Sequence, residues 1–234
     1  MIFDTVVDLH CLGSNTQCFP LYWYESEDEN IVKHDGISDY ILQEVNTKLK
    51  SNFIKEDIFY YVYGILNSNE YTTVFENDLK KSLPKIPIID NLDEFTKILN
   101  IGKKLADLHL NYEKSELYKN CTIIKNKENY NVIKMRFGKN KDKSIIEYND
   151  NIIIKDIPEK AYEYIINGKS AIEWIMERYS ITKDKKSEII NNPNDWSKEN
   201  NDEEYILNLL LKIINISIKT VDLRKKIPNL NLNK

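Results

Sequence analysis

Apolar and polar residues follow two different patterns along the chain, and the change between them falls at about residue 118. Before it, apolar side chains recur every three or four positions, as on the buried face of an amphipathic helix. After it, apolar and polar residues alternate in short runs separated by Asn, Lys, Gly and Asp, as in β-strands. The pattern therefore predicts a largely helical first part and a second part that begins with strands.

The first part is predicted to hold four helices after a short β region. These helices cover residues 37–50, 55–67, about 69–81 and about 92–113, and Asn69 is expected to cap the third. Two strands are predicted over residues 3–11 and 17–24, where Pro20 favours a sheet edge or a bulge. The tyrosines of residues 55–67 are more typical of a core than of a platform for stacked bases.

The second part is predicted to begin with an antiparallel meander. Its strands are "CTIIKN", "NVIKMRF", "SIIEYN" and "NIIIKDI", with a tight turn at Asn149-Asp150. Short helices on both sides of Asn167-Gly168, an irregular stretch over residues 182–201 and a long helix from Glu203 to about Lys226 follow. The whole chain indicates an α+β fold, with helices packed around a small, mostly antiparallel sheet. We expect residues 1–234 to form a single domain, helical over about 1–118 and a β-meander plus helices over about 119–234.

The charge of the chain is unevenly distributed. The net charge is −4, but residues 125–143 hold seven basic side chains against two acidic ones, a local net charge of +5. Such a cluster can be a nucleic-acid-binding face on an acidic body, or a hairpin tip whose lysines only keep it solvated. Composition alone does not separate these two interpretations.

One short motif resembles the end of a phosphate-binding loop. Gly168-Lys169-Ser170 has the right last residues, but Glu163 stands where such a loop needs its first glycine. We therefore interpret Asn167-Gly168 as the end of one helix, with Gly168 in the left-handed conformation. Ser170 and Glu173 are then expected to form the capping box of the next helix.

The sequence offers little for catalysis or for metal binding. His10 and Cys11 are neighbours on a predicted strand and would point to opposite faces, and Glu147 with Asp150 is more typical of a strand end and its turn than of a metal site. The thiols of Cys11, Cys18 and Cys121 form no C-x-x-C pair, which favours a reducing cytoplasm. No apolar run is long enough to span a membrane, and no signal peptide is evident. These features favour a cytoplasmic binding or structural module without catalytic activity.

Several blocks of the chain resemble one known family. The long stretch "NVIKMRFGKNKDKSIIEYNDNIIIKDIPEKAYEYIINGKSAIEWIMERYSITKDKKSEIINNPNDW" is similar to the C-terminal specificity domain of single-polypeptide (type ISP) restriction–modification enzymes. The earlier blocks "CFPLYWYE", "EDIFYYVYGILNSNEYTTVFENDLKKSLPKIPI" and "GKKLADLHLNYE" follow the order and spacing of the same family. One departure is Glu188, where the family pattern has a glycine.

The resemblance implies a sequence-specific target-recognition module for double-stranded DNA. Its partners would be the methyltransferase and helicase-like domains of a parent polypeptide, for which it would position DNA for adenine methylation, translocation and cleavage. S-adenosylmethionine, ATP and Mg²⁺ would be used by that parent, and this chain would need no cofactor. The alternative is a docking domain within the same enzyme that has no DNA specificity of its own.

The candidate DNA-binding residues lie in two segments. They are Lys134, Arg136, Lys139, Lys141 and Lys143 in the basic meander, and Lys183, Lys185, Asn191, Asn192 and Asn194 in the later loop. The guanidinium fork of Arg136 matches guanine O6 and N7, lysines can contact phosphates, and asparagine amides can pair with adenine N6 and N7. The alternatives without DNA contact are that Lys134 and Arg136 form the solvent-exposed face of a strand, opposite Ile133, Met135 and Phe137, and that the asparagines are turn residues.

Overall fold

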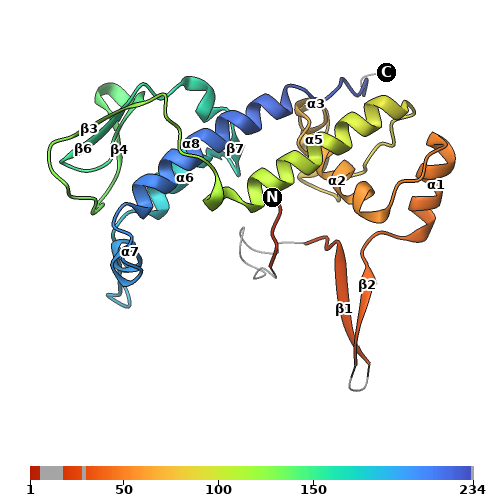
Figure 1. Cartoon of the computed structure of the whole chain (residues 1–234), viewed down its shortest axis with the longest axis horizontal. Coiled ribbons are helices and arrows are strands. Elements are labelled where there is room, and N and C mark those ends of the chain that lie inside the picture. Colours follow the sequence, from red (N-terminus) through yellow and green to blue (C-terminus); the bar gives the residue numbers. More distant parts are fainter. Residues whose placement is uncertain (6–17, 28–29, 233–234) are drawn as a thin grey trace. The chain divides into compact units, whose positions relative to one another are not determined.

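The computed structural model describes residues 1–5, 18–27 and 30–232, which form two compact units (Figure 1). The first unit comprises Met1–Leu110 and Leu223–Lys234, and the second comprises Asn111–Asp222. Most of the strand predicted over residues 3–11, with His10 and Cys11, lies outside the described residues. That the two units together act as one recognition domain stays a prediction.

The first unit is built from helices around two apolar clusters. Its helices are α1 (Asp39–Leu49), α2 (Lys55–Leu66), α3 (Asn69–Val74), α4 (Glu76–Leu79) and α5 (Leu92–Leu110). Tyr61 of α2 stacks on Phe95 of α5 with ring centroids 3.9 Å apart, and both side chains are buried. The tyrosine-rich helix is therefore part of the core, as its pattern predicted. The helices α2 and α5 approach so closely that a Cβ on Gly102 would lie 1.9 Å from the Tyr60 carbonyl oxygen.

The predicted third helix is wrong in two details. Its N-cap is Ser68, whose Oγ accepts a hydrogen bond from Tyr71 N–H, rather than Asn69. It also breaks at Phe75, which has φ −101° and ψ 18°, so that α3 and α4 are separate short helices. The run Thr72-Thr73-Val74 is β-branched and therefore holds a helix only weakly. Residues 83–89, which contain two prolines, form no helix or strand.

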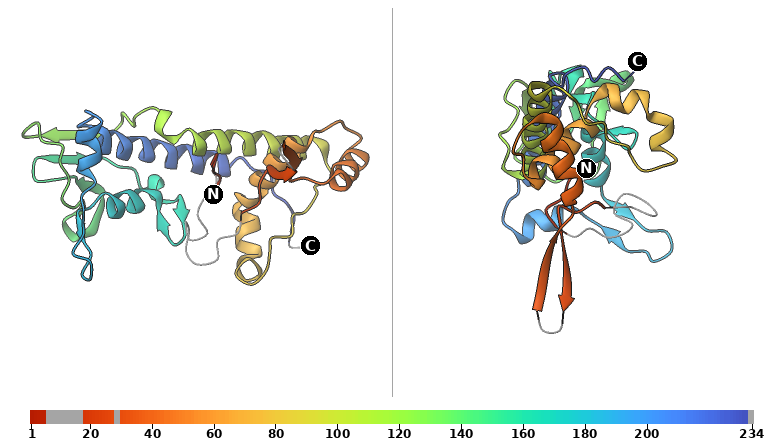
Figure 2. Two further views of the ribbon diagram at one scale, coloured as in Figure 1. Left: turned by 90° about the horizontal axis from the view of Figure 1, so that it is seen from below. Right: turned by 90° about the vertical axis from the view of Figure 1, so that its right-hand side faces the viewer.

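A two-stranded hairpin precedes these helices. Strands β1 (Tyr22–Glu27) and β2 (Asn30–Asp35) pair antiparallel, and the Trp23 ring stacks on His34 at 4.1 Å. The strand predicted over residues 17–24 therefore begins later, after Pro20. Figure 2 shows this hairpin extending away from the helices of its own unit.

The second unit contains a four-stranded antiparallel sheet with the order β3-β6-β5-β4. The strands are β3 (Thr122–Lys125), β4 (Arg136–Gly138), β5 (Asp142–Glu147) and β6 (Ile152–Lys155). Alternate residues of β5 and β6, such as Ile146 and Ile154, are fully buried and pack with helices α6 (Ala171–Arg178) and α8 (Tyr205–Arg224). The α+β class, the antiparallel pairing and the turn at Asn149-Asp150 are thus confirmed. The predicted four-stranded meander holds only for β4, β5 and β6, because β3 pairs with β6 and not with β4.

Smaller elements complete the second unit. They are the 3₁₀ helices η1 (Tyr112–Lys114), η2 (Lys139–Lys141) and η3 (Glu159–Tyr162), the strand pairs β7 (Ile165–Ile166) with β8 (Lys169–Ser170) and β9 (Thr182–Lys183) with β10 (Ile190–Asn191), and helix α7 (Asn194–Glu199). None of the helices that the structure describes is long and apolar enough to cross a membrane.

The interpretation of Asn167-Gly168 as a helix end is wrong. These two residues form the turn of the β7–β8 hairpin, with φ values of 47° and 82°. A two-residue hairpin turn of type I′ needs positive φ at both positions, and Asn-Gly is the sequence that tolerates this best. The expected capping box is confirmed, because Ser170 Oγ accepts from Glu173 N–H and the Glu173 carboxylate accepts from Ser170 N–H.

The stability of the first unit is expected to depend on the pH through His109. Burial lowers the pKa of its imidazole to about 4 from 6.5, and the positive charges of the Met1 amino group and Arg224 add to this effect. Between pH 6.5 and 4 the imidazole is protonated in the unfolded chain but not in the folded chain. The contribution of neutral His109 to the free energy of unfolding is therefore fully present above pH 6.5 and is lost as the pH falls toward 4. Urea unfolding should show a loss of about 2 kcal/mol between pH 6.5 and 4.5.

The variant His109→Gln should remove most of this pH dependence while keeping an acceptor for the Tyr63 hydroxyl, which lies 2.7 Å from His109 Nδ1. Carboxylates with a lowered pKa, such as Glu76, have an ordinary value of 4.5 and act mainly below this window. An unchanged slope in His109→Gln would mean that another group controls the transition.

Candidate functional site

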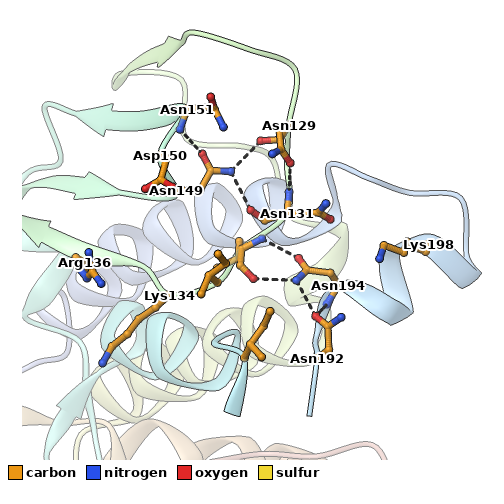
Figure 3. Close-up of a pocket in the computed structure, with 13 residues that line it drawn as sticks. Asn129, Asn131, Lys134, Arg136, Asn149, Asp150, Asn151, Asn192, Asn194 and Lys198 are labelled. Carbon is orange, nitrogen blue, oxygen red and sulfur yellow. Dashed lines mark hydrogen bonds between the residues drawn. The ribbon is translucent and has the colours of Figure 1, made fainter. Parts of the chain in front are cut away.

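The second unit contains an open pocket between the sheet, the segment before β4 and the start of α7 (Figure 3). It has a volume of about 520 Å³. Its polar lining consists of Asn129, Asn131, Lys134, Arg136, Asn149, Asp150, Asn151, Asn192, Asn194 and Lys198, and its apolar lining of Val132, Ile133 and Ile181. The predicted residues Lys134, Arg136, Asn192 and Asn194 are therefore brought together, although they are distant in the sequence.

Asn194 joins the two segments that form the pocket. Its side chain is buried, with 4% exposed, and makes a pair of hydrogen bonds to the backbone of Val132. Asn194 Oδ1 accepts from Val132 N–H at 2.8 Å, while Asn194 Nδ2 donates to the Val132 carbonyl at 2.8 Å and to Asn192 Oδ1 at 2.8 Å. The amide thus takes the place of a strand neighbour for this residue, and it fixes the chain before β4 against α7.

Asn149 fixes the other side of the same segment. Its Nδ2 donates to the carbonyl oxygens of Asn129 at 2.8 Å and Asn131 at 3.0 Å. Its Oδ1 accepts from the backbone N–H groups of Asn151 and Ile152, each at 2.8 Å. Both functions of this amide are therefore used in holding the turn and the segment together, as the dashed lines in Figure 3 show.

The strand predicted over residues 131–137 is much shorter than expected, and this changes the face on which its side chains lie. Residues 131–135 are irregular and β4 begins only at Arg136. Val132 and Met135 are buried, whereas Ile133, Lys134 and Arg136 are exposed. The expectation that Ile133 lies opposite Lys134 and Arg136 is therefore wrong, since period two holds only within a strand.

Lys134 and Arg136 differ from several other basic residues in lacking a partner. Among the described residues, the side chain of neither makes a hydrogen bond or an ion pair. Lys143, on β5, has its Nζ 3.0 Å from the Glu173 carboxylate and above the Phe137 and Tyr162 rings. Lys134 and Arg136 thus offer unneutralised donors at the pocket, and Lys143 does not.

Apart from Asn192, the remaining candidates lie away from the pocket. Lys139 and Lys141 are exposed in η2, where Asn140 and Lys141 have positive φ, and Lys185 is exposed in the loop between β9 and β10. Lys183 Nζ is 3.4 Å from the Glu188 carboxylate, and Asn191 is exposed on β10. Asn192 lines the pocket, and its Nδ2 donates to Asp195 at 2.8 Å. Glu188, where the resemblance led us to expect glycine, has φ 58°, a backbone conformation that favours glycine.

Residue pattern alone missed most of the pocket. Its polar lining also includes residues that were not expected there, namely Asn129, Asn131, Asn149, Asp150, Asn151 and Lys198. The only signal for them was the density of asparagine on either side of the meander, which an asparagine-rich chain makes weak. Among the described residues, no group of three or more His, Cys, Asp or Glu side chains can hold a metal ion, and Glu147 with Asp150 forms none.

The family model of the Type ISP C-terminal specificity domain matches residues 1–209. The chain belongs to this family. Two solved structures of Type ISP enzymes agree with this assignment, and a third solved structure is also similar to the chain. The restriction–modification enzyme LlaBIII bound to DNA has a TM-score of 0.81 and 41% identity, and the match covers 91% of this chain and 14% of that chain.

The second structure is a nuclease-deletion mutant of the Type ISP enzyme LlaGI in complex with a DNA substrate mimic, with a TM-score of 0.70 and 44% identity over 76% of this chain and 14% of that chain. The third is a DrdV–DNA complex, with a TM-score of 0.80 and 25% identity over 97% of this chain and 23% of that chain. The chain thus spans less than a quarter of the length of each of these proteins. No curated protein matches it.

The variant Asn194→Ala is expected to destabilise the second unit by about 2–4 kcal/mol. It leaves the buried N–H and carbonyl of Val132 without their partners, and each unsatisfied group costs about 1–3 kcal/mol. Amide hydrogen exchange at Val132 should accelerate strongly, and urea unfolding should give the free-energy change. Asn191→Ala removes the same side chain from an exposed position and should change stability by less than about 0.5 kcal/mol. Equal effects of the two variants would contradict this role for Asn194.

Proposed function

We propose that this chain is the sequence-specific duplex-DNA recognition module of a Type ISP restriction–modification enzyme. The observation that carries the proposal is the pocket of the second unit. There the side chains of Lys134 and Arg136, which have no partner among the described residues, lie beside several amides on a fixed backbone. Family membership and the DNA-bound state of similar enzymes, such as LlaBIII, support it.

The polar groups of the pocket suit the major groove, where each base pair presents its own pattern of donors and acceptors. Arg136 is exposed at the start of β4, and its fork can donate to O6 and N7 of a guanine. The side chains of Asn131 and Asn151 can pair with adenine, and Asp150 can accept from the amino group of cytosine. Asn194 has a different part in this proposal, since its amide is buried and holds the backbone that presents Arg136.

The lysines around the pocket suit phosphates, which set the register of the protein on the duplex. Lys134 and Lys198 line the pocket, and Lys139, Lys141 and Lys185 are exposed outside it. Lys143 and Lys183 are paired with carboxylates, and Lys198 Nζ lies 4.0 Å from the Asp195 carboxylate, so these lysines would have to exchange a protein partner for a phosphate. We therefore rank them below the other lysines as DNA contacts.

In the parent enzyme, this module would hold the target for a linked adenine methyltransferase and for translocase–nuclease parts. Chemistry on a base requires the base to leave the helix, so a recognition module that grips the flanking duplex assists the methyltransferase without reacting itself. S-adenosylmethionine, ATP and Mg²⁺ would belong to those other parts.

The proposal is tested by binding the purified chain to a randomised duplex pool at low and at moderate salt, with sequencing of the bound fraction. Enrichment of a short motif supports sequence-specific recognition. Binding without enrichment would reduce the function to a basic face. No binding at low salt, by this chain alone and again with the methyltransferase part attached, would favour a docking domain instead.

Arg136→Ala should weaken binding to the enriched duplex by about 1–3 kcal/mol and relax the preference at one guanine position. The loss should be small on duplexes that already lack this guanine. Arg178→Ala is the matched control, because Arg178 is exposed on α6 above the Trp174 ring and does not line the pocket. A uniform loss over all sequences would make Arg136 a phosphate contact.

Lys139→Ala and Lys141→Ala should each weaken binding to all sequences alike. Each phosphate contact releases about one counterion, so the slope of log K against log salt should become shallower by about 1 for each variant. Titrations between about 50 and 200 mM salt measure this slope, because affinity that depends on phosphate contacts falls steeply over this range. Lys219→Ala, at an exposed position of α8, should leave the slope unchanged. Slopes equal to that of the unsubstituted chain would mean that Lys139 and Lys141 of η2 do not contact the DNA.

A further inference from the structure

Two isoleucines interrupt the polar lining of the pocket. Ile133 is 68% exposed and Ile181 is 38% exposed, and both line the same cavity as Arg136 and the amides. The Ile181 N–H donates to the Ile133 carbonyl at 2.9 Å, so the two residues are neighbours in space. A lone exposed isoleucine needs no explanation. Two of them together, in a wall of amides and cations, form a small apolar spot that the fold has not covered.

The backbone around Ile133 is fixed on both sides. Asn194 binds both the N–H and the carbonyl of Val132, and the Ile133 carbonyl accepts from Ile181. The side chain itself is β-branched and stiff at χ1. Ile133 therefore presents its methyl groups with little conformational freedom left to lose, which is the condition for discriminating a ligand that differs by one small group.

Among the four bases, only thymine presents a methyl group in the major groove, and apolar side chains are what reads it. We propose that Ile133, with Ile181 beside it, contacts the C5-methyl group of a thymine in the recognised duplex and is a specificity-determining residue. This inference rests on the proposed function and deepens it. It assigns the apolar spot to one base, next to the positions that Arg136 and the amides can read.

The surroundings of Ile133 favour a base edge over an apolar protein surface as the partner. A stable protein interface buries roughly 800 Å² on each side, with an apolar centre and few charges there. Here the apolar spot consists of two side chains, and Lys134, Arg136 and Lys198 line the same pocket. Cations around a small apolar spot match a methyl group beside a phosphate backbone.

The test replaces each thymine of the enriched duplex, one at a time, by deoxyuridine, which lacks only the methyl group. One replacement should weaken binding of the unsubstituted chain about fourfold, the effect expected for one buried methyl-sized group. The same replacement should weaken binding of Ile133→Ala less than about 1.5-fold, because the contact is already gone. Ile165→Ala is the matched control, since Ile165 is 51% exposed on β7 and does not line the pocket, and it should keep the fourfold effect.

Each outcome of this experiment either supports or overturns the thymine contact of Ile133. An enriched motif in which no thymine shows a methyl effect, or in which the effect persists in Ile133→Ala, overturns the inference and leaves sequence-specific recognition standing. The absence of any enriched motif removes the proposed function and the inference with it. Equal melting temperatures of Ile133→Ala and the unsubstituted chain confirm that the variant is folded, as expected for a substitution at so exposed a position.

Discussion

The paired hydrogen bonds between the Asn194 amide and the backbone of Val132 are the interaction on which the candidate site depends. The segment before β4 is irregular, so it has no ladder of its own to satisfy its buried backbone groups. A side-chain amide presents a donor and an acceptor side by side in one plane, which is what a neighbouring strand would have offered. On the other side, Asn149 donates to the carbonyl oxygens of Asn129 and Asn131 and accepts from the backbone of its own turn. Two asparagines thus convert a loop into a fixed frame, and Ile133, Lys134 and Arg136 are exposed on it.

This frame also explains how an acidic chain can have a face suited to DNA. The net charge is −4, but the basic residues of the meander do not all act alike. Glu173 neutralises Lys143 within the fold, and Glu188 pairs with Lys183 in the later loop. Lys134 and Arg136 have no such partner among the described residues, and they lie next to amides that can form directional hydrogen bonds. Charge then supplies attraction, while the rigid amides and isoleucines supply discrimination.

The errors of the sequence-based predictions share one physical cause. Around Asn167-Gly168, apolar residues at helical spacing suggested a helix end, but the tight Asn-Gly turn and the pairing of β7 with β8 prevailed. At residues 131–135, alternation suggested a strand, but side-chain amides replaced the ladder. In the third helix, a β-branched run allowed a break at Phe75. In each case local propensity was weak, and contacts with residues distant in the sequence, or turn geometry, decided the conformation.

The sequence by itself determined the α+β class, the long helices, the antiparallel strands β4 to β6 and the capping box at Ser170, because hydrophobic periodicity and local hydrogen bonds act over a few residues. The place of β3 beside β6 was decided by the tertiary structure. The block order of the sequence also identified the Type ISP specificity family, and its charge pattern directed attention to Lys134 and Arg136. Only the tertiary structure decided that these residues meet Asn192 and Asn194 in one pocket, that Asn194 is a buried support, and that Ile133 faces outward with them. Those facts depend on hydrogen bonds between residues about 60 positions apart, such as Val132 and Asn194, and no local pattern encodes such contacts.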